Sequence, residues 1–177
     1  MEFTKLVQER RSVRSYREAE VSKEDIEEMV RTALFAASWK NTETGRYYVA
    51  LSKEAVDAVR DALPDFNRNS TENAAYIVAS FKKGESGWSN TINGFTDELR
   101  DSWGAYDLGL QNSYLMLKAT ELGYDTLVMG IRDEKKLRGY FNIPQDEAVM
   151  PVIAIGKRAE EPKLRPRREV KNVLSLK

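Results

Sequence analysis

Residues 74–81 form the stretch Ala74-Ala75-Tyr76-Ile77-Val78-Ala79-Ser80-Phe81, a nearly continuous apolar run. A run without polar alternation is typical of a β-strand that is covered on both faces. Residues 97–122 are expected to form a long helix, with apolar side chains around most of its circumference and Gly123 at its carboxyl-terminal cap. The two segments together predict a buried strand next to a central helix.

Shorter segments complete an α+β pattern. We expect helices over residues 4–9, 22–37, 54–63 and 133–140, with Ser22 and Ser52 as amino-terminal caps. Strands are expected over residues 46–51, 126–129 and 149–155, with a short one near 173–174. Pro64 and the polar residues 67–72 are expected to break the chain between elements. The order predicts one domain over residues 1–177, a mixed or antiparallel sheet wrapped by helices.

Composition limits the chemistry. The 177 residues include 28 Lys and Arg, 28 Asp and Glu, and neither cysteine nor histidine. Disulfides, Cys or His metal sites, and Cys–His or Ser–His catalysis are therefore excluded, and we expect no metal. The zero net charge argues against nucleic-acid or membrane-surface partners. A charged start and the lack of any 18-residue apolar run indicate a cytoplasmic protein.

Basic residues gather near both ends of the chain. One cluster is Arg10-Arg11-Ser12-Val13-Arg14, and the other is Lys163-Leu164-Arg165-Pro166-Arg167-Arg168, within a basic arm over residues 157–177. A guanidinium binds phosphate oxygens through two parallel hydrogen bonds and keeps its charge at cellular pH. If the fold joins the two clusters, they form one site for a small anion. The alternative is that both are solvated charge runs.

A loop rich in Gly, Ser and Asn covers residues 82–96 and contains Trp88 and Phe95. It is too long for a simple connection, so we expect either a lid over a functional site or a mobile excursion. Its two aromatic side chains could stack on a planar substrate or pack on the protein's own flank.

Several motifs, in order, resemble the FMN-dependent nitroreductases over essentially the whole chain. They are Arg10-Arg11-Ser12-Val13-Arg14, Ala37-Ser38-Trp39-Lys40-Asn41-Thr42, Tyr106-Asp107-Leu108-Gly109-Leu110-Gln111-Asn112, Leu122 to Gly130, Ile143-Pro144, Ile155-Gly156 and Arg165-Pro166-Arg167. Two positions depart from similar chains. Similar chains often have Gln, then Pro or Thr, then Trp where this one has Glu43-Thr44-Gly45. Ala37 stands where proline is common.

The resemblance implies a homodimer with two FMN sites, each built from both subunits. Arg10 and Ser12 would hold the flavin phosphate and ribityl chain, with Arg11 in the same site, and Arg165 and Arg167 would complete the phosphate clamp. Arg14 would lie near N1 and O2 of the ring. The partner subunit would supply Ser38, Trp39 and Asn41. Leu127, Val128, Met129 and Gly130 would cover one ring face, with an N–H of Met129 or Gly130 directed at N5. Asp107 is expected to be structural.

The activity implied by the resemblance is an NAD(P)H-driven, ping-pong reduction of nitroaromatics, quinones or similar acceptors, by hydride transfer through flavin N5. No protein acid or base is needed for hydride transfer itself, so a chain without His or Cys is compatible with this chemistry. Two alternatives remain: a flavin-binding carrier or sensor without significant turnover, and a scaffold that binds another phosphate compound. NADH and NADPH are equally compatible with the sequence.

Overall fold

The computed structural model describes residues 2–177, and its centre is a five-stranded antiparallel sheet. The strands are β1 (Tyr16–Arg17), β2 (Gly45–Ala50), β3 (Ala75–Lys82), β6 (Asp125–Met129) and β7 (Glu147–Arg158). Strand β7 pairs with β3, β6 and β1, and β2 pairs with β3. The expected α+β fold with an antiparallel sheet is confirmed.

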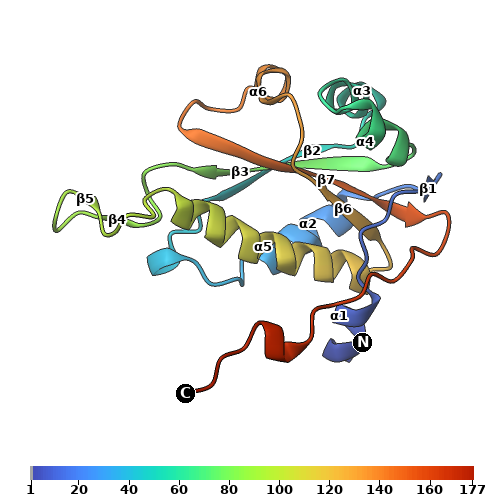
Figure 1. Cartoon of the computed structure of the whole chain (residues 1–177). Helices are drawn as coiled ribbons and strands as arrows, with labels where there is room; N and C mark the ends of the chain where they lie inside the picture. The colour runs from blue at the N-terminus through green and yellow to red at the C-terminus, as the bar shows by residue number, and fades with distance from the viewer. Residues whose placement is uncertain (1) are drawn as a thin grey trace.

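Helices cover both faces of this sheet (Figure 1). One face carries α1 (Phe3–Glu9), α2 (Lys23–Ala33) and α5 (Ser102–Glu121), and the other carries α3 (Lys53–Asp61), α4 (Asp65–Ser70) and α6 (Glu134–Phe141). Tyr76 and Val78 of β3 pack in the core on the α3 and α6 side, whereas Ile77 packs on the α2 and α5 side. Burial on both faces explains the unbroken apolar run in this strand.

Local signals set several helix boundaries correctly. The Oγ of Ser22 accepts a hydrogen bond from the Asp25 N–H at 3.1 Å, and the Oγ of Ser52 accepts one from the Ala55 N–H at 3.2 Å. Both are amino-terminal caps as expected. Helix α2 ends at Ala33, four residues before the expected end, and α5 starts at Ser102, five residues after the expected start.

Four parts of the chain differ from the sequence-based expectation. The short helix α4 follows Pro64 directly, where a break was expected, because a proline is tolerated at the start of a helix. Strand β1 was not anticipated. Residues 170–172 form a 3₁₀ turn, so the expected strand near 173–174 is wrong. Residues 82–96 contain a hairpin of β4 (Trp88–Ser89) and β5 (Gly94–Phe95).

Helix α5 packs closely on the sheet on one side and is open on the other. A Cβ at Gly104 would lie 2.3 Å from Cδ2 of Phe81, so the helix needs glycine to approach β3 at this point. On the opposite side Tyr106 and Tyr114 are 58% and 43% exposed, and a Cβ at Gly109 would meet nothing within 4 Å. Across residues 2–177, no helix has the length and apolar character that a membrane crossing requires.

Candidate functional site

The amino-terminal basic segment, residues 10–14, is an extended stretch fixed by Val13. Val13 is 1% exposed, its N–H donates to the Thr126 carbonyl of β6 at 3.1 Å, and its carbonyl accepts from the Tyr16 hydroxyl at 3.2 Å. Because side chains alternate along an extended chain, burial of Val13 leaves its neighbours Ser12 and Arg14 exposed. The apolar residue in the motif therefore anchors the polar ones.

The carboxyl-terminal basic segment, residues 163–168, is brought to the same place by β7. Strand β7 continues to Arg158, where it pairs with β1, and the Ala159 N–H then donates to the Ser15 carbonyl at 2.9 Å. The first two residues of the expected arm thus belong to the sheet. A cavity of about 300 Å³ lies between the two segments. Its lining includes Arg10, Arg11, Ser12, Arg14, Lys163, Arg165 and Arg167.

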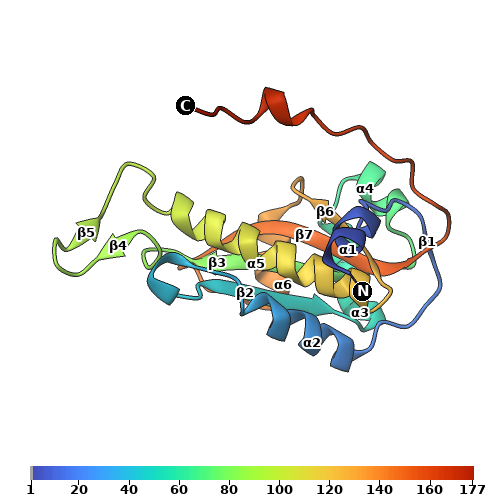
Figure 2. The same ribbon diagram turned by 90° about the horizontal axis from the view of Figure 1, so that it is seen from below.

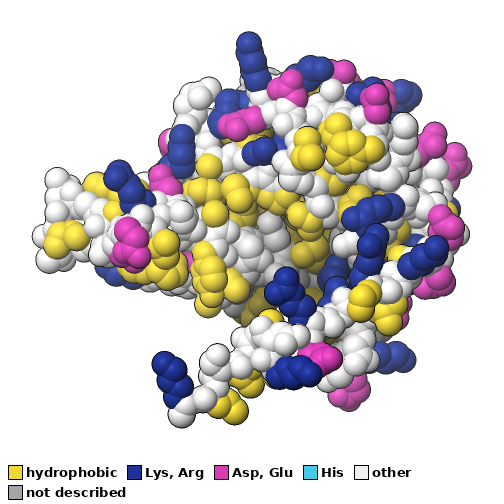
Figure 3. Space-filling model, viewed as in Figure 1, with side chains coloured by type: hydrophobic (Ala, Val, Ile, Leu, Met, Phe, Trp, Pro, Cys, Tyr) yellow, Lys and Arg dark blue, Asp and Glu magenta, His cyan; other side chains and the backbone are white. Residues whose placement is uncertain are grey.

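Positive charge dominates this cavity. In Figure 3, Lys and Arg side chains border the place where the tail crosses the body. Within residues 2–177, none of the five guanidiniums at positions 10, 11, 14, 165 and 167 forms an ion pair. Burial, followed by the positive charges of Arg167 and Arg11, lowers the pKa of Arg10. A bound anion would relieve this repulsion.

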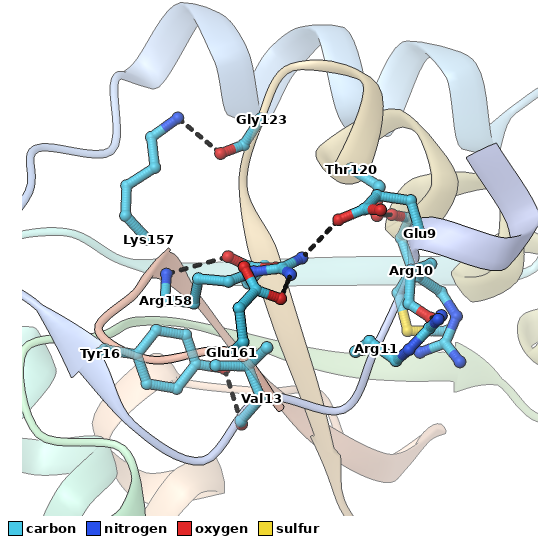
Figure 4. A network of polar contacts seen from close by, with 12 residues as sticks. Glu9, Arg10, Arg11, Val13, Tyr16, Thr120, Gly123, Lys157, Arg158 and Glu161 are labelled. Carbon is cyan, nitrogen blue, oxygen red and sulfur yellow. Dashed lines mark hydrogen bonds and ion pairs between the residues drawn. The ribbon is translucent and has the colours of Figure 1, made fainter. Parts of the chain in front are cut away.

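Arg158 ties together the elements that carry the two basic segments (Figure 4). Its Nη2 lies 3.2 Å from a carboxylate oxygen of Glu9, at the end of α1, and its Nη1 lies 2.8 Å from Glu161 in the tail. Its Nε and Nη2 donate to Oδ1 of Asp125 in β6. No role was predicted from the sequence for Glu9, Asp125, Arg158 or Glu161, because two of the partners of Arg158, Glu9 and Asp125, lie far from it in the chain.

Residues 38–43, which we call the Trp39 turn, adopt a strained but well-bonded conformation. Lys40, Asn41 and Glu43 have positive φ angles of 46°, 56° and 49°, which cost energy in residues other than glycine. The Ser38 Oγ accepts from the Glu43 N–H at 3.2 Å, and the Asn41 Nδ2 donates to the Glu43 carboxylate at 2.8 Å. Glu43, which belongs to the segment 43–45 that departs from similar chains, therefore orients Asn41.

Gly45, in the same segment that departs from similar chains, lies against α5, and a larger residue here would displace the Gln111 side chain. A Cβ at this position would lie 1.9 Å from Oε1 of Gln111, which is a buried side chain. Asp107, one turn earlier on α5, is also buried and accepts a hydrogen bond from the Trp39 N–H at 3.0 Å. The structure thus gives Asp107 the partner that a structural role requires.

The β6 residues divide between the core and the surface. Leu127 and Met129 are each 3% exposed and belong to the core on the α3 and α6 side, whereas Val128 is 45% exposed. Gly130 is also exposed. Among the side chains of residues 127–129, only that of Val128 is therefore available to a ligand.

One chain does not bring all the predicted residues together. The basic cavity lies by α1 and the end of α5, whereas the Trp39 turn is bonded to Asp107 in the first half of α5. Thr120 lies in the last turn of α5, thirteen residues after Asp107, which corresponds to about 20 Å at 1.5 Å per residue. Within one chain, Ser38, Trp39 and Asn41 are thus separate from the basic cavity.

Known proteins share both the sequence pattern and the fold. The model of the Nitroreductase family matches residues 7–157. The chain belongs to the nitroreductase family. Among related sequences, a candidate NADH dehydrogenase/NAD(P)H nitroreductase of Archaeoglobus fulgidus is 26% identical over 164 residues, covering 90% of this chain and 87% of the relative. A candidate NAD(P)H nitroreductase of Bacillus subtilis is 26% identical over 189 residues, covering 90% of each chain.

Solved structures of this family have the same fold. A candidate nitroreductase of Exiguobacterium sibiricum, determined in complex with FMN, superimposes with a TM-score of 0.86 at 23% identity, over 100% of this chain and 98% of that one. A candidate NAD(P)H:FMN oxidoreductase of Staphylococcus epidermidis gives a TM-score of 0.83 at 21% identity, over 99% and 95% of the two chains.

Proposed function

We propose that this nitroreductase-family protein is an FMN-dependent NAD(P)H oxidoreductase. The observation that carries the proposal is the basic cavity, where five guanidiniums without carboxylate partners and the Ser12 hydroxyl line about 300 Å³. Paired charges would be a structural feature, whereas unpaired ones around a hollow favour an anionic ligand. The flavin phosphate supplies that charge. The FMN-bound relative of Exiguobacterium sibiricum supports the choice of this cofactor.

The residues around the cavity fit the phosphate half of FMN. In our proposal, Arg10, Arg11, Arg165 and Arg167 bind the phosphate oxygens, and Ser12 binds the phosphate or the ribityl chain. The lowered pKa of Arg10, caused by burial and by its cationic neighbours, supports this arrangement, because a phosphate would reverse the unfavourable charge. Arg158 is not a ligand in this scheme, since its guanidinium is bound to carboxylates.

The edge of β6 suits the ring half of the cofactor. Val128 presents an exposed apolar side chain, and Arg14 lies on the cavity side, where it can offset negative charge on the ring. Since the Thr126 carbonyl faces the outer edge, alternation along the strand directs Met129 toward β7 and Gly130 outward. Gly130 is therefore the better candidate for an amide aimed at the ring. When bound, FMN supplies hydride transfer between NAD(P)H and an acceptor.

A homodimer completes the proposed site. The Trp39 turn is remote from the cavity of its own chain, so Ser38, Trp39 and Asn41 would reach the cofactor held by a second copy. Exposed apolar side chains support such an assembly: Tyr106 and Tyr114 on α5, and Val173 and Leu176 in the tail. Light scattering should give a particle of about twice the 20.2 kDa chain mass, and a monomer with full FMN occupancy would contradict the shared site.

The acceptors that we propose are nitroaromatics, quinones or similar planar compounds. The hairpin of β4 and β5 offers Trp88 and Phe95, whose rings pack edge to face at 5.3 Å, with the Arg100 guanidinium over Phe95. It projects away from the body of its own chain (Figures 1 and 2). We therefore propose that it acts as a lid over the cofactor of the partner subunit.

A visible spectrum of the purified protein tests the cofactor, and anaerobic reduction tests the activity. We expect a yellow protein that carries about one FMN for each basic cavity, that bleaches with NADH or NADPH, and that regains its colour when a quinone is added. Protein that neither contains nor takes up flavin would refute the proposal. Flavin that binds but is not reduced by either nucleotide would instead indicate a carrier or sensor.

A further inference from the structure

Two lines of contact lead from the Trp39 turn to the two strands of the hairpin. On the first, the Trp39 N–H and the Ser86 hydroxyl both donate to Oδ2 of Asp107, at 3.0 and 2.6 Å. On the second, the Trp39 ring packs on the Trp103 ring at 5.0 Å, and the Trp103 indole N–H donates to Asp97. Ser86 precedes β4 and Asp97 follows β5, so both ends of the hairpin are connected to Trp39.

The base of the hairpin is closely packed. The Gly84 N–H donates to Asp101 at 2.7 Å, and the Thr96 N–H donates to the Gly87 carbonyl at 2.9 Å. Gly87 has a φ of +79°, and a Cβ there would lie 2.8 Å from both the Trp103 ring and the Arg100 carbonyl. This segment is therefore fixed where it leaves the body of the protein, and it is not an unstructured excursion.

Asp107 accepts hydrogen bonds from both Trp39 and Ser86. It is 2% exposed, and Ser86 is also 2% exposed. A buried carboxylate that loses one of its donors remains poorly solvated, which favours keeping both donors in place together. Because the two donors reach the same oxygen, the positions of residue 39 and residue 86 depend on one atom.

We propose that Asp107 is a positioning residue that makes the Trp39 turn and the hairpin one unit, so that a ligand held by the turn also orders the hairpin. The inference rests on the proposed function, in which the turn contacts FMN of the partner subunit. The turn and the lid from one chain then serve the same cofactor. Flavin occupancy in this way prepares the surface on which the acceptor binds.

Hydrogen exchange of the amides of residues 84–96, measured with and without FMN, tests this coupling. The decisive variant is Ser86→Ala, which removes the hairpin side of the link and leaves the Trp39 hydrogen bond intact. Ser70→Ala is the matched control, because it removes a hydroxyl that bonds only locally in α4. FMN affinity is measured on each protein by the quenching of flavin fluorescence.

In the wild type and in Ser70→Ala we expect FMN to slow hairpin exchange by about 10-fold, the scale of one hydrogen bond to a charged group. In Ser86→Ala the slowing should be clearly smaller, because only the contact through Trp103 and Asp97 remains, while the FMN dissociation constant stays within about 2-fold. Asp107→Ala should lose both the slowing of exchange and FMN affinity. Asp107→Asn keeps an acceptor oxygen, so its slowing and its FMN affinity should lie between those of the wild type and those of Asp107→Ala.

The outcomes separate this inference from the function on which it rests. If FMN binds and slows hairpin exchange equally in the wild type, Ser86→Ala and Asp107→Asn, the coupling through Asp107 is wrong and the flavin site stands. If FMN binds and leaves the hairpin unaffected in the wild type, the coupling is also wrong. If no variant and no wild-type protein binds FMN, the proposed function fails and the inference fails with it.

Discussion

Arg158 binds Asp125 through three hydrogen bonds. Its Nε and Nη2 donate to Oδ1 at 2.9 and 2.6 Å, and its backbone N–H donates to Oδ2 at 2.9 Å. The carboxylate raises the pKa of Arg158 further above its usual value, chiefly through this hydrogen bonding. Since Glu9 and Glu161 bind the same guanidinium, this pair fixes the position of both basic segments on the sheet.

Replacing Asp125 by Ala should therefore lower both stability and cofactor affinity. We expect the free energy of unfolding to fall by about 2–3 kcal/mol, below the loss for a fully isolated buried pair, because Glu9 and Glu161 remain as partners of Arg158. Urea unfolding measures this change. Glu169→Ala is the control, since its ion pair with Lys171 is largely exposed and should contribute less than about 0.5 kcal/mol. Equal effects of the two substitutions would contradict the role of Asp125.

Single substitutions in the basic cavity should weaken FMN binding without unfolding the protein. Arg10→Ala or Arg167→Ala removes a charge-assisted hydrogen bond to phosphate, which should cost roughly 1.5–3 kcal/mol of binding free energy. Arg168→Ala is the matched control, because Arg168 does not line the cavity. Fluorescence titration with FMN gives the three affinities. Unchanged FMN affinity in both Arg10→Ala and Arg167→Ala would show that these residues do not bind the phosphate.

The helices and strands could largely be predicted because their signals are local. The cap at Ser22 and the apolar run in β3 depend on residues within one element, and both positions agree with the structure. The start of α5 was mistaken for a different reason. Asp97 bonds the Leu99 N–H and the Trp103 indole, and Arg100 has a φ of 48°, so tertiary contacts hold residues 97–101 out of the helix.

Only part of the candidate site could be predicted from the sequence. The two basic clusters could be identified by composition, and the fold brings them together at one cavity. The supporting residues could not be identified in this way, because Arg158 and Asp125 are 33 positions apart and each resembles an ordinary surface charge. The positive φ angles of Lys40, Asn41 and Glu43 were equally hidden, since no glycine marks the Trp39 turn.

Substitutions in the hairpin should change the use of large acceptors and leave FMN affinity unchanged. Trp88→Ala or Phe95→Ala removes one ring of the edge-to-face pair, which takes away apolar surface on which a planar acceptor can stack. We expect a higher Michaelis constant for a bulky nitroaromatic and a smaller change for a small quinone. Steady-state kinetics with the two acceptors measures the difference. Identical parameters for both variants and the wild type would show that the hairpin does not contact the acceptor.

Two neighbouring tyrosines should respond in opposite ways to replacement by phenylalanine. The Tyr48 hydroxyl donates to the buried Glu147 carboxylate at 2.9 Å, so Tyr48→Phe should cost about 1–2 kcal/mol of stability. The buried Tyr47 hydroxyl finds no hydrogen-bond partner within residues 2–177, so Tyr47→Phe should be neutral or stabilising. Urea unfolding at neutral pH compares the two variants. Equal losses of stability in the two variants would mean that the hydrogen bond from Tyr48 to Glu147 does not stabilise the protein.

Alkaline pH should destabilise the protein through these same side chains. Burial, and then the hydrogen bond to Glu147, raises the pKa of Tyr48 to about 12, and burial raises the pKa of Tyr47 as well. Unfolded tyrosine loses its proton near pH 10. Between pH 10 and about 12 the unfolded state therefore binds fewer protons than the folded state, and stability falls as pH rises. Tyrosinate absorbance during an alkaline titration measures the ionisation of the tyrosines. The fall in stability with rising pH should be shallower in Tyr47→Phe. Titration of every tyrosine near pH 10 in the folded protein would contradict the burial of these hydroxyls.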